Sequence, residues 1–274
     1  MRVCGHTMGV PGRDAFQAIK LFSDMGFDGI ELRCASDGQI DPENYTEEEG
    51  TKIREAADAF GLEIACLTPY YKDYLSPERR RNEIDGMKKV IDIAGLLRCT
   101  RMRAYGGTEP PQVVDETKAW NLTVPALKEI CEYADDVGVY VCIENHPGTL
   151  ARTAAETVKL VEEVRSDNVK ILYDQANISR INGEDFATAI DAQRDHIYHV
   201  HVKDQKFING KRVPTLLGKG TVEWRSILEE LNRIGYQGFL SDEYEKHWHP
   251  DLLPEPEVGM KHNLQYVREI LKRL

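Results

Sequence analysis

Eight short apolar runs, each followed by a segment with helical patterning, constrain this chain more than any other feature. The runs are rich in β-branched and bulky residues and have the length of strands, whereas the segments between them are long enough for helices. Regular alternation of this kind requires a parallel sheet with right-handed crossovers and buried strand faces. The predicted strands are residues 2–8, 27–33, 62–68, 99–105, 139–145, 169–174, 197–203 and 239–243.

The number of repeats and the chain length point to one closed barrel. Eight β-α units close most simply into a ring, and 274 residues are close to the roughly 250 that such a barrel takes. We therefore expect an α/β protein in which residues 1–274 form a single (β/α)8 barrel domain. In such barrels the functional residues lie at the carboxyl ends of the strands.

Four successive predicted strands end in side chains that can bind a metal ion. These side chains are Glu144, Asp174, His201 and Glu243. Because side chains alternate along a strand, all four can point into the barrel. Three carboxylates gathered there would repel one another, and a divalent cation would remove that conflict. We predict one divalent metal ion, and the three oxygen ligands with one nitrogen favour Mn²⁺ or Co²⁺, with Mg²⁺ or Zn²⁺ as alternatives.

Two of these four residues, Glu144 and Glu243, are also the predicted catalytic pair. They come from strands that lie far apart around the predicted ring, so they can flank a substrate on opposite faces. One carboxylate would remove a proton next to a carbonyl group and the other would return it. The metal ion would bind the carbonyl and hydroxyl oxygens of a ketose and stabilise the enediolate that forms.

Further polar residues near the predicted strand ends are candidates for substrate binding. These candidates are His6, Arg103, His146, His199 and Lys203. For the histidines, the competing interpretation is packing or support of the metal ligands. For Lys203, it is an ion pair with Asp204 or Glu245.

Two other regions of the rim have simpler predicted roles. Glu31 and Arg33 carry opposite charges on the second predicted strand, and we expect them to form an ion pair at the rim. Residues 204–221 contain several glycines and are long enough for a loop that covers the site or contacts the substrate.

Five short segments contain most of these polar residues together with their neighbours. They are residues 143–146 (IENH), 173–174 (YD), 199–204 (HVHVKD), 217–224 (LGKGTVEW) and 238–245 (GFLSDEYE). With these segments the chain resembles the sugar phosphate isomerase/epimerase family of xylose isomerase-like barrels. The similarity runs in register from Gly26 to the C-terminus and is strongest after Val139. Members of that family include ketose 3-epimerases, hydroxypyruvate isomerases, inosose dehydratases and type 2 apurinic endonucleases.

The resemblance implies roles for the same four residues. In the epimerases of the family, the glutamates of strands five and eight are both metal ligands and the acid/base pair, and they correspond to Glu144 and Glu243. An aspartate and a histidine on strands six and seven complete the ligand set, and they correspond to Asp174 and His201. Many members have a histidine three residues after that aspartate, where this chain has Asn177. Asparagine can bind a sugar hydroxyl but cannot carry a proton, so we expect Asn177 only to bind substrate.

The leading functional hypothesis is a metal-dependent sugar isomerase or epimerase that acts on a small ketose or polyol ketone. The alternative is a dehydratase of the inosose dehydratase type, in which the same proton is removed and a β-hydroxyl group then leaves. Metal-dependent phosphodiester hydrolysis, as in the apurinic endonucleases, is the least expected. The early strands offer Thr68, Arg103 and Tyr105 where a multinuclear zinc site would need histidines.

Charge and composition limit the partners. A formal net charge of −11 would repel a phosphate backbone, so nucleic acid is not an expected partner. The six cysteines occur singly without metal-binding spacing, which is typical of buried thiols in a reducing compartment. No apolar run has membrane-spanning length. We expect a cytoplasmic enzyme with a small carbohydrate substrate and no membrane partner, and the sequence leaves open whether it forms a homo-oligomer.

Overall fold

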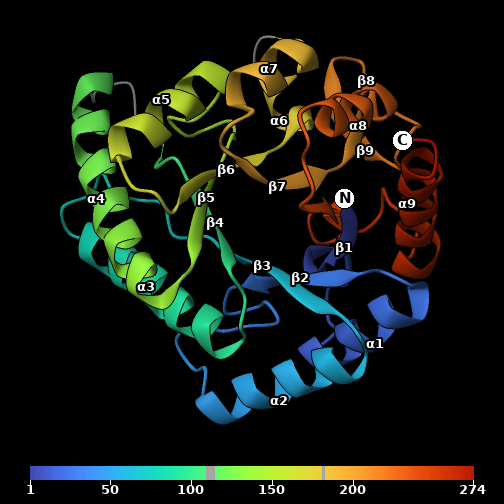
Figure 1. Cartoon of the computed structure of the whole chain (residues 1–274), viewed down its shortest axis with the longest axis horizontal. Helices are drawn as coiled ribbons and strands as arrows, with labels where there is room; N and C mark the ends of the chain where they lie inside the picture. The colour runs from blue at the N-terminus through green and yellow to red at the C-terminus, as the bar shows by residue number, and fades with distance from the viewer. Residues whose placement is uncertain (109–114, 181–182) are drawn as a thin grey trace.

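The computed structural model describes residues 1–108, 115–180 and 183–274. Within these residues, eight parallel strands close into a barrel in the order β1-β10-β7-β6-β5-β4-β3-β2 (Figure 1). This architecture confirms the predicted (β/α)8 fold, and the observed strand bounds lie close to the predicted ones. The strands are β1 Arg2–His6, β2 Gly29–Cys34, β3 Glu63–Pro69, β4 Arg101–Tyr105, β5 Tyr140–Glu144, β6 Val169–Tyr173, β7 Ile197–Val202 and β10 Phe239–Asp242.

Helices form an outer ring around the barrel (Figure 1). They are α1 Ala15–Met25, α2 Glu47–Ala59, α3 Arg80–Leu96, α4 Glu116–Val137, α5 Ala154–Val164, α6 Gln175–Ile178, α7 Phe186–Gln193, α8 Trp224–Arg233 and α9 Pro256–Leu271, with short 3-10 turns η1 Thr7–Gly9 and η2 Glu245–His247. In α8 the buried side chains recur at the spacing of one helix face, Trp224, Ile227, Leu228 and Leu231. None of the helices in the described part of the chain is both long and apolar enough to cross a bilayer.

Local signals in the sequence fix where β5 begins and where the following helix starts. α4 ends at Gly138, whose φ of 77° is the left-handed conformation that glycine adopts most easily. α5 begins after Thr153, whose hydroxyl accepts a hydrogen bond from the Glu156 N–H at 3.2 Å. The Glu156 carboxylate accepts the Thr153 N–H at 3.0 Å in return, which completes a capping box. These two boundaries leave β5 and its terminal Glu144 in place between the helices.

Alternation along the strands separates an apolar layer from a polar interior. On β7, Val200 and Val202 pack in the apolar core between strands and helices. His199 and His201 alternate with them, and both reach Glu31 on β2 across the inside of the barrel. The centre of the barrel therefore holds polar groups, while the apolar core lies between the strands and the helices. All six cysteines are buried and unpaired, as expected.

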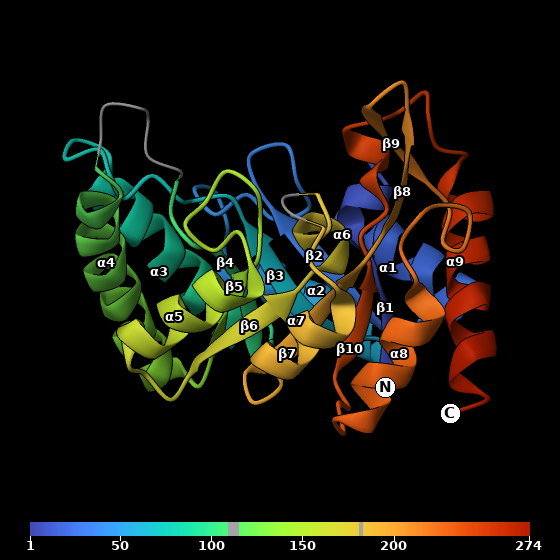
Figure 2. The same ribbon diagram turned by 90° about the horizontal axis from the view of Figure 1, so that it is seen from above.

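The predicted loop over residues 204–221 contains regular structure that was not predicted, because most of it is a β-hairpin. β8 Asp204–Ile208 pairs antiparallel with β9 Lys211–Thr215. The turn residues Asn209 and Gly210 have φ values of 50° and 75°, as a two-residue hairpin turn requires. Asn-Gly is a strong hairpin signal, and it is visible in the sequence. Figure 2 shows the hairpin projecting from the end of the barrel at which the strands finish.

One side chain closes the base of this hairpin. The Asp204 carboxylate accepts four backbone N–H groups, from Gln205 and Val222 on one oxygen and from Gly218 and Gly220 on the other, at 2.8 to 3.1 Å. A Cβ at Gly220 would lie 2.1 Å from this carboxylate, so the close approach requires glycine. The segment that leaves β7 is thus tied to the segment that enters α8.

Candidate active site

The carboxyl ends of four strands bring the predicted metal ligands together. Glu144 is the last residue of β5, Asp174 follows β6, His201 lies in β7 and Glu243 follows β10. All four side chains are buried, and their ligand atoms lie within 4.8 Å of one another. The structure therefore gathers all four residues at one point.

Backbone contacts explain how Asp174 is held. Asn145 donates from Nδ2 to the Asp174 carbonyl at 2.7 Å and accepts the Asp174 N–H at 3.0 Å. The Asp174 Oδ1 atom accepts the Asn177 N–H at 3.0 Å and so caps the short helix α6. One carboxylate oxygen is thereby fixed by the backbone, and Oδ2 is left for the interior of the site.

Two cations lie among the three carboxylates. The Lys203 ammonium is 2.5 Å from Glu243 Oε2 and 2.8 Å from Asp174 Oδ2. Arg103 Nη1 is 3.3 Å from Glu144 Oε2. Lys203 is therefore paired with Glu243 and Asp174, and its distance of 3.9 Å from Glu245 makes that predicted pairing a weak one.

The environment separates the pKa values of these carboxyl groups. Burial opposes ionisation of Glu144, but the His201 imidazole and the Arg103 guanidinium outweigh it and hold the pKa of Glu144 at about 2. Burial, together with the charges of Glu243 and Glu144, outweighs the favourable Lys203 ammonium and raises the pKa of Asp174 to about 6. Of the three buried carboxyl groups, Asp174 therefore carries the cost of their proximity, because its pKa is raised to about 6.

The geometry of His201 fits a divalent cation at this point. Its Nδ1 atom is 3.4 Å from Glu243 Oε2 and 3.6 Å from Glu144 Oε1. Nδ1 has no hydrogen-bond partner among the described residues, although it is buried. A cation between these atoms would satisfy both the buried nitrogen and the carboxylates that face it. Three carboxylates with one imidazole form a donor set that suits a hard or borderline divalent ion.

Glu31 and Arg33 do not form the predicted ion pair at the rim. Arg33 instead pairs with Asp37 at 2.6 Å. Glu31 points into the barrel, where its carboxylate is fully buried and meets the imidazoles of His199 and His201. Sequence reasoning missed this role because it did not assign Glu31 to the inner face of β2.

Four of the predicted substrate-binding residues border the carboxylate cluster. Arg103 contacts the faces of Tyr70 and Tyr105, with its guanidinium carbon 4.6 and 4.3 Å from their centroids. Asn177 donates from Nδ2 to Glu144 Oε1 at 3.1 Å, and its Oδ1 has no partner in the described part of the chain. His146 packs against Tyr105 with ring centroids 5.1 Å apart. Lys203 is the fourth, through the contacts described above.

The other two candidates lie deeper. Among the described residues, His199 forms its hydrogen bond through Nε2, which is 2.7 Å from Glu31 Oε2. His6 accepts the Met8 N–H on Nδ1 at 3.0 Å, and its Nε2 is 3.6 Å from Glu31 Oε1. Burial outweighs the favourable Glu31 charge and lowers the pKa of His6 to about 4. Both imidazoles therefore belong to the surroundings of Glu31.

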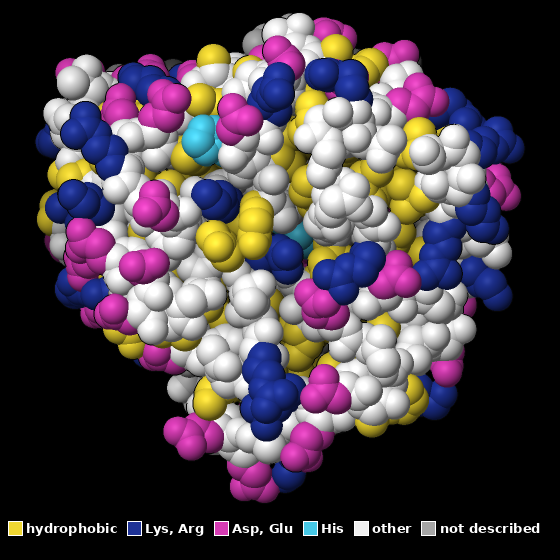
Figure 3. All heavy atoms as spheres, in the orientation of Figure 1, with side chains coloured by type: hydrophobic (Ala, Val, Ile, Leu, Met, Phe, Trp, Pro, Cys, Tyr) yellow, Lys and Arg dark blue, Asp and Glu magenta, His cyan; other side chains and the backbone are white. Residues whose placement is uncertain are grey.

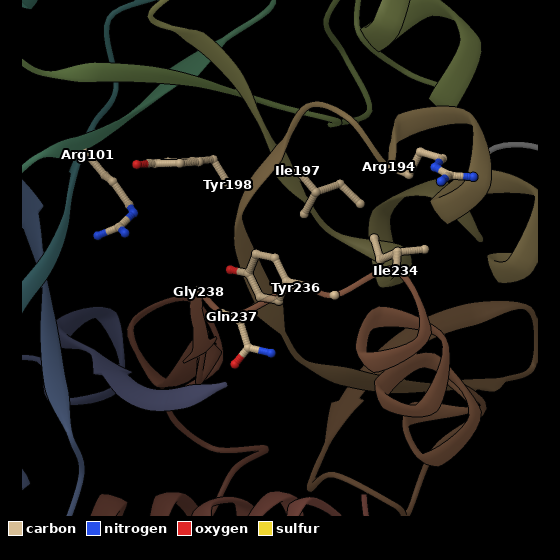
Figure 4. A pocket seen from close by; sticks show the side chains of 9 residues that line it. Arg101, Arg194, Ile197, Tyr198, Ile234, Tyr236, Gln237 and Gly238 are labelled. Atoms are coloured by element: carbon tan, nitrogen blue, oxygen red, sulfur yellow. The ribbon is translucent and has the colours of Figure 1, made fainter.

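A separate hollow of about 360 Å³ lies at the amino ends of the strands (Figure 4). Figure 3 looks onto this end, where basic and hydrophobic side chains gather near the centre of the face. The described residues that line the hollow include Arg101, Tyr198 and Tyr236, and none of them is a carboxylate. The chemistry-bearing groups are therefore at the opposite end, as expected for this fold.

Comparisons with known proteins agree with this fold. Residues 19–270 match a family model described as a xylose isomerase-like TIM barrel. The inosose dehydratase of Geobacillus thermodenitrificans is 27% identical over 165 residues, which cover 55% of this chain and 54% of that enzyme, so the chain spans about half of its length. The D-psicose 3-epimerase of Agrobacterium fabrum is 27% identical over 234 residues, covering 80% of this chain and 75% of that enzyme.

Solved structures share the same fold. An L-ribulose 3-epimerase has a TM-score of 0.83 at 19% identity, covering 99% of this chain and 95% of that one. A D-psicose 3-epimerase with D-tagatose from Clostridium cellulolyticum has a TM-score of 0.80 at 18% identity, covering 99% of both chains. With the family match over most of its length, the chain belongs to the xylose isomerase-like TIM barrel family.

Proposed function

We propose that this protein is a metal-dependent enzyme that isomerises or epimerises a small ketose or polyol ketone by moving a proton next to the carbonyl group. The observation that carries the proposal is the placement of Glu144 and Glu243. They come from β5 and β10, three strands apart around the ring, and both face His201 Nδ1. The similarity to a D-psicose 3-epimerase over 80% of the chain supports this choice of reaction.

Glu144, Asp174, His201 and Glu243 would hold the divalent ion, and their donor set suits Mn²⁺ or Co²⁺. When bound, such an ion supplies positive charge that stabilises the negative oxygens developed during proton removal. The protein's own contribution is to hold the ligand atoms in a buried site from which bulk water is largely excluded.

The two glutamates have different neighbouring side chains, but both are kept ionised by them. Lys203 lies against Glu243, and burial is outweighed by the Lys203 and His201 charges, so the pKa of Glu243 is well below its usual range. Glu144 is held by Arg103 and by the Asn177 amide. Both carboxylates are therefore ionised at neutral pH and can accept a proton. Epimerisation uses one on each face of the substrate, whereas isomerisation needs only one.

The surrounding side chains fit a small hydroxylated substrate. Arg103, His146 and Lys203 offer hydrogen-bond donors, and the free Oδ1 of Asn177 offers an acceptor. Tyr70 and Tyr105 lie against the Arg103 guanidinium and provide flat apolar surface beside it. A compact polyol has hydroxyl groups that can bond to these polar groups and C–H faces that can pack against the tyrosine rings.

Dehydration is the second candidate, favoured by the similarity to an inosose dehydratase. The same carboxylate would remove the proton, and a β-hydroxyl group would then leave as water after receiving a proton. The buried Lys203 ammonium lies 2.5 Å from Glu243 Oε2. It could therefore donate the proton that the leaving hydroxyl group needs. A hydrolase of the apurinic endonuclease type is the least supported, since the acidic chain and the lack of histidines at the ends of β3 and β4 both oppose it.

The test is incubation of the Mn²⁺-loaded protein in D₂O with a panel of ketoses and inososes, with NMR analysis of the products. Deuterium next to the carbonyl in an isomeric product is the expected result. Exchange that accompanies an unsaturated or deoxy product would replace the isomerase assignment by a dehydratase. Absence of exchange with every compound would contradict proton abstraction as the reaction.

A further inference from the structure

Glu31 lies at the centre of a second polar group, below the four proposed ligands. It is on β2, three strands around the ring from β7, and its side chain is fully buried. Its Oε1 atom is 2.9 Å from His201 Nε2, and its Oε2 atom is 2.7 Å from His199 Nε2. The Thr68 hydroxyl donates to Oε1 as well. Glu31 therefore meets His201 from the side opposite to the carboxylate cluster.

These contacts determine where the proton of His201 resides. An ionised carboxylate can only accept hydrogen bonds, so each imidazole facing it must carry hydrogen on Nε2. A neutral His201 with hydrogen on Nε2 has its lone pair on Nδ1. This is the atom that faces Glu144 and Glu243 and has no other partner in the described residues. The lone pair is thus directed at the point where the proposed ligands converge.

We propose that Glu31 is a positioning residue that fixes His201 with hydrogen on Nε2, and thereby makes Nδ1 the metal-binding atom. The inference rests on the metal site of the proposed function. A carboxylate that accepts the far N–H of a metal-bound imidazole orients the ring and makes the ligand nitrogen more basic. Glu31 performs this task from a strand that supplies none of the four ligands.

The other contacts of Glu31 explain why the carboxylate itself stays in place. A buried carboxylate is costly unless its oxygens are satisfied. Thr68 and His199 satisfy it together with His201, and the Nδ1 atom of His199 has no hydrogen-bond partner within the described chain. His199 and Thr68 therefore hold Glu31, and Glu31 holds His201.

Mn²⁺ binding, measured by the EPR signal of the free ion, tests the proposal without recourse to activity. Glu31→Met removes every acceptor and should weaken Mn²⁺ binding about 100-fold. Glu31→Gln keeps one carbonyl oxygen for the His201 N–H and should weaken binding about 10-fold. Glu63→Gln, at the first residue of β3 and the opposite end of the barrel, is the matched control and should bind Mn²⁺ like the wild type.

The outcomes separate the two proposals. If the wild-type protein binds no divalent metal, the proposed function fails and the inference fails with it. If the wild type binds Mn²⁺ and both Glu31 variants bind it equally well, only the role of Glu31 is overturned.

A measurement on the wild type makes the test independent of how the variants fold. In ¹⁵N-histidine-labelled protein loaded with Zn²⁺ as a diamagnetic probe, long-range ¹H–¹⁵N correlations report which ring nitrogen carries hydrogen. The expected pattern for His201 is hydrogen on Nε2 and coordination through Nδ1. Hydrogen on Nδ1, or coordination through Nε2, would refute the proposal.

Discussion

The two ends of the barrel both hold partly or fully buried cations, but they satisfy them in different ways. At the carboxyl end, Lys203 and Arg103 lie against buried carboxylates at 2.5 to 3.3 Å. At the amino end, Arg101 stacks over Tyr198, with its guanidinium carbon 4.8 Å from the ring centroid, and its nearest carboxylate is Glu63 at 3.8 Å. Both ends place an arginine against aromatic rings, since Arg103 also contacts Tyr70 and Tyr105. Only the carboxyl-end arrangement brings several buried carboxylates close to its cations.

This difference suggests that the carboxyl end of the barrel serves function and the amino end serves stability. The carboxyl end contains a carboxyl group with a raised pKa and a buried nitrogen without a partner, both of which are unfavourable for folding alone. The amino end has aromatic and cationic side chains that cover the bottom of the barrel, and no carboxyl group lines its hollow among the described residues. Substitutions at the carboxyl end should therefore change chemistry most, and substitutions at the amino end should change stability most.

The largest expected effect is the loss of turnover on replacing either glutamate at the carboxyl end. Glu144→Gln and Glu243→Gln each remove a base but keep the side-chain shape, so kcat should fall by about 10³-fold or more. Circular dichroism should show an unchanged fold. Near-normal turnover in one variant would show that this glutamate does not transfer a proton. It would also contradict the expectation that substitutions at the carboxyl end affect chemistry most.

The next largest effect concerns the pH dependence of folding in the metal-free protein. The pKa of Asp174 is raised to about 6 in the folded state, against about 3.9 in an unfolded chain. The folded state therefore holds this proton more tightly, and the stability it contributes is present below about pH 4 and lost as pH rises through 6. At about 1.4 kcal/mol per pKa unit, the loss is about 3 kcal/mol.

Asp174→Asn isolates this contribution, because asparagine does not ionise. Urea unfolding between pH 4 and 7, in the presence of a chelator, should show a smaller decline for the variant than for the wild type. Asp24→Asn, on the exposed surface of α1, serves as the control and should keep the wild-type slope. Identical slopes for Asp174→Asn and the wild type would mean that Asp174 ionises normally.

A smaller effect is expected for metal affinity at low pH. A carboxylate must lose its proton to bind a cation, and Asp174 does so with a pKa of about 6. Below that pH, Mn²⁺ affinity should fall by about tenfold for each pH unit from this residue alone. Isothermal titration at pH 7, 6 and 5 measures the change. A constant affinity over this range would show that Asp174 either ionises normally or does not bind the ion, and the urea experiment on Asp174→Asn distinguishes the two.

The smallest effect is predicted at the amino end. The Tyr236 hydroxyl donates to the Phe239 carbonyl at 2.8 Å, and both groups are buried. Tyr236→Phe removes this bond and should reduce the free energy of unfolding by about 1 kcal/mol. Turnover and Mn²⁺ binding should be unchanged. A loss of turnover without a loss of stability would show that the two ends are not independent.

Much of this arrangement follows from one-dimensional patterns in the sequence. Alternation of apolar runs with helical segments predicts the barrel, and the polar residues at the ends of four runs predict which side chains meet. The grouping of Glu144 with Asp174 needs only strand parity and the rule that parallel strands end on one side. The catalytic roles of these residues remain predictions.

Other features depend on information that strand patterns do not contain. Glu31 was expected at the rim beside Arg33, because the two charges are close in sequence. Its actual partner His201 is 170 positions away and lies across the barrel, a contact fixed by ring closure and not by local sequence. The hairpin of β8 and β9 differs from this case, because its Asn209-Gly210 turn is a local signal that the sequence contains.

The clasp formed by Asp204 has a consequence for how such an enzyme can diversify. The Asp204 carboxylate binds the backbone at both ends of the segment 204–222, through the N–H groups of Gln205 and Val222. The tip at residues 209–210 can then change in length, because longer or shorter turns add little closure entropy and leave the end of β7 and the start of α8 unchanged. Descendants of this chain can therefore acquire new rims by insertion at the tip, while the residues inside the barrel keep the same positions.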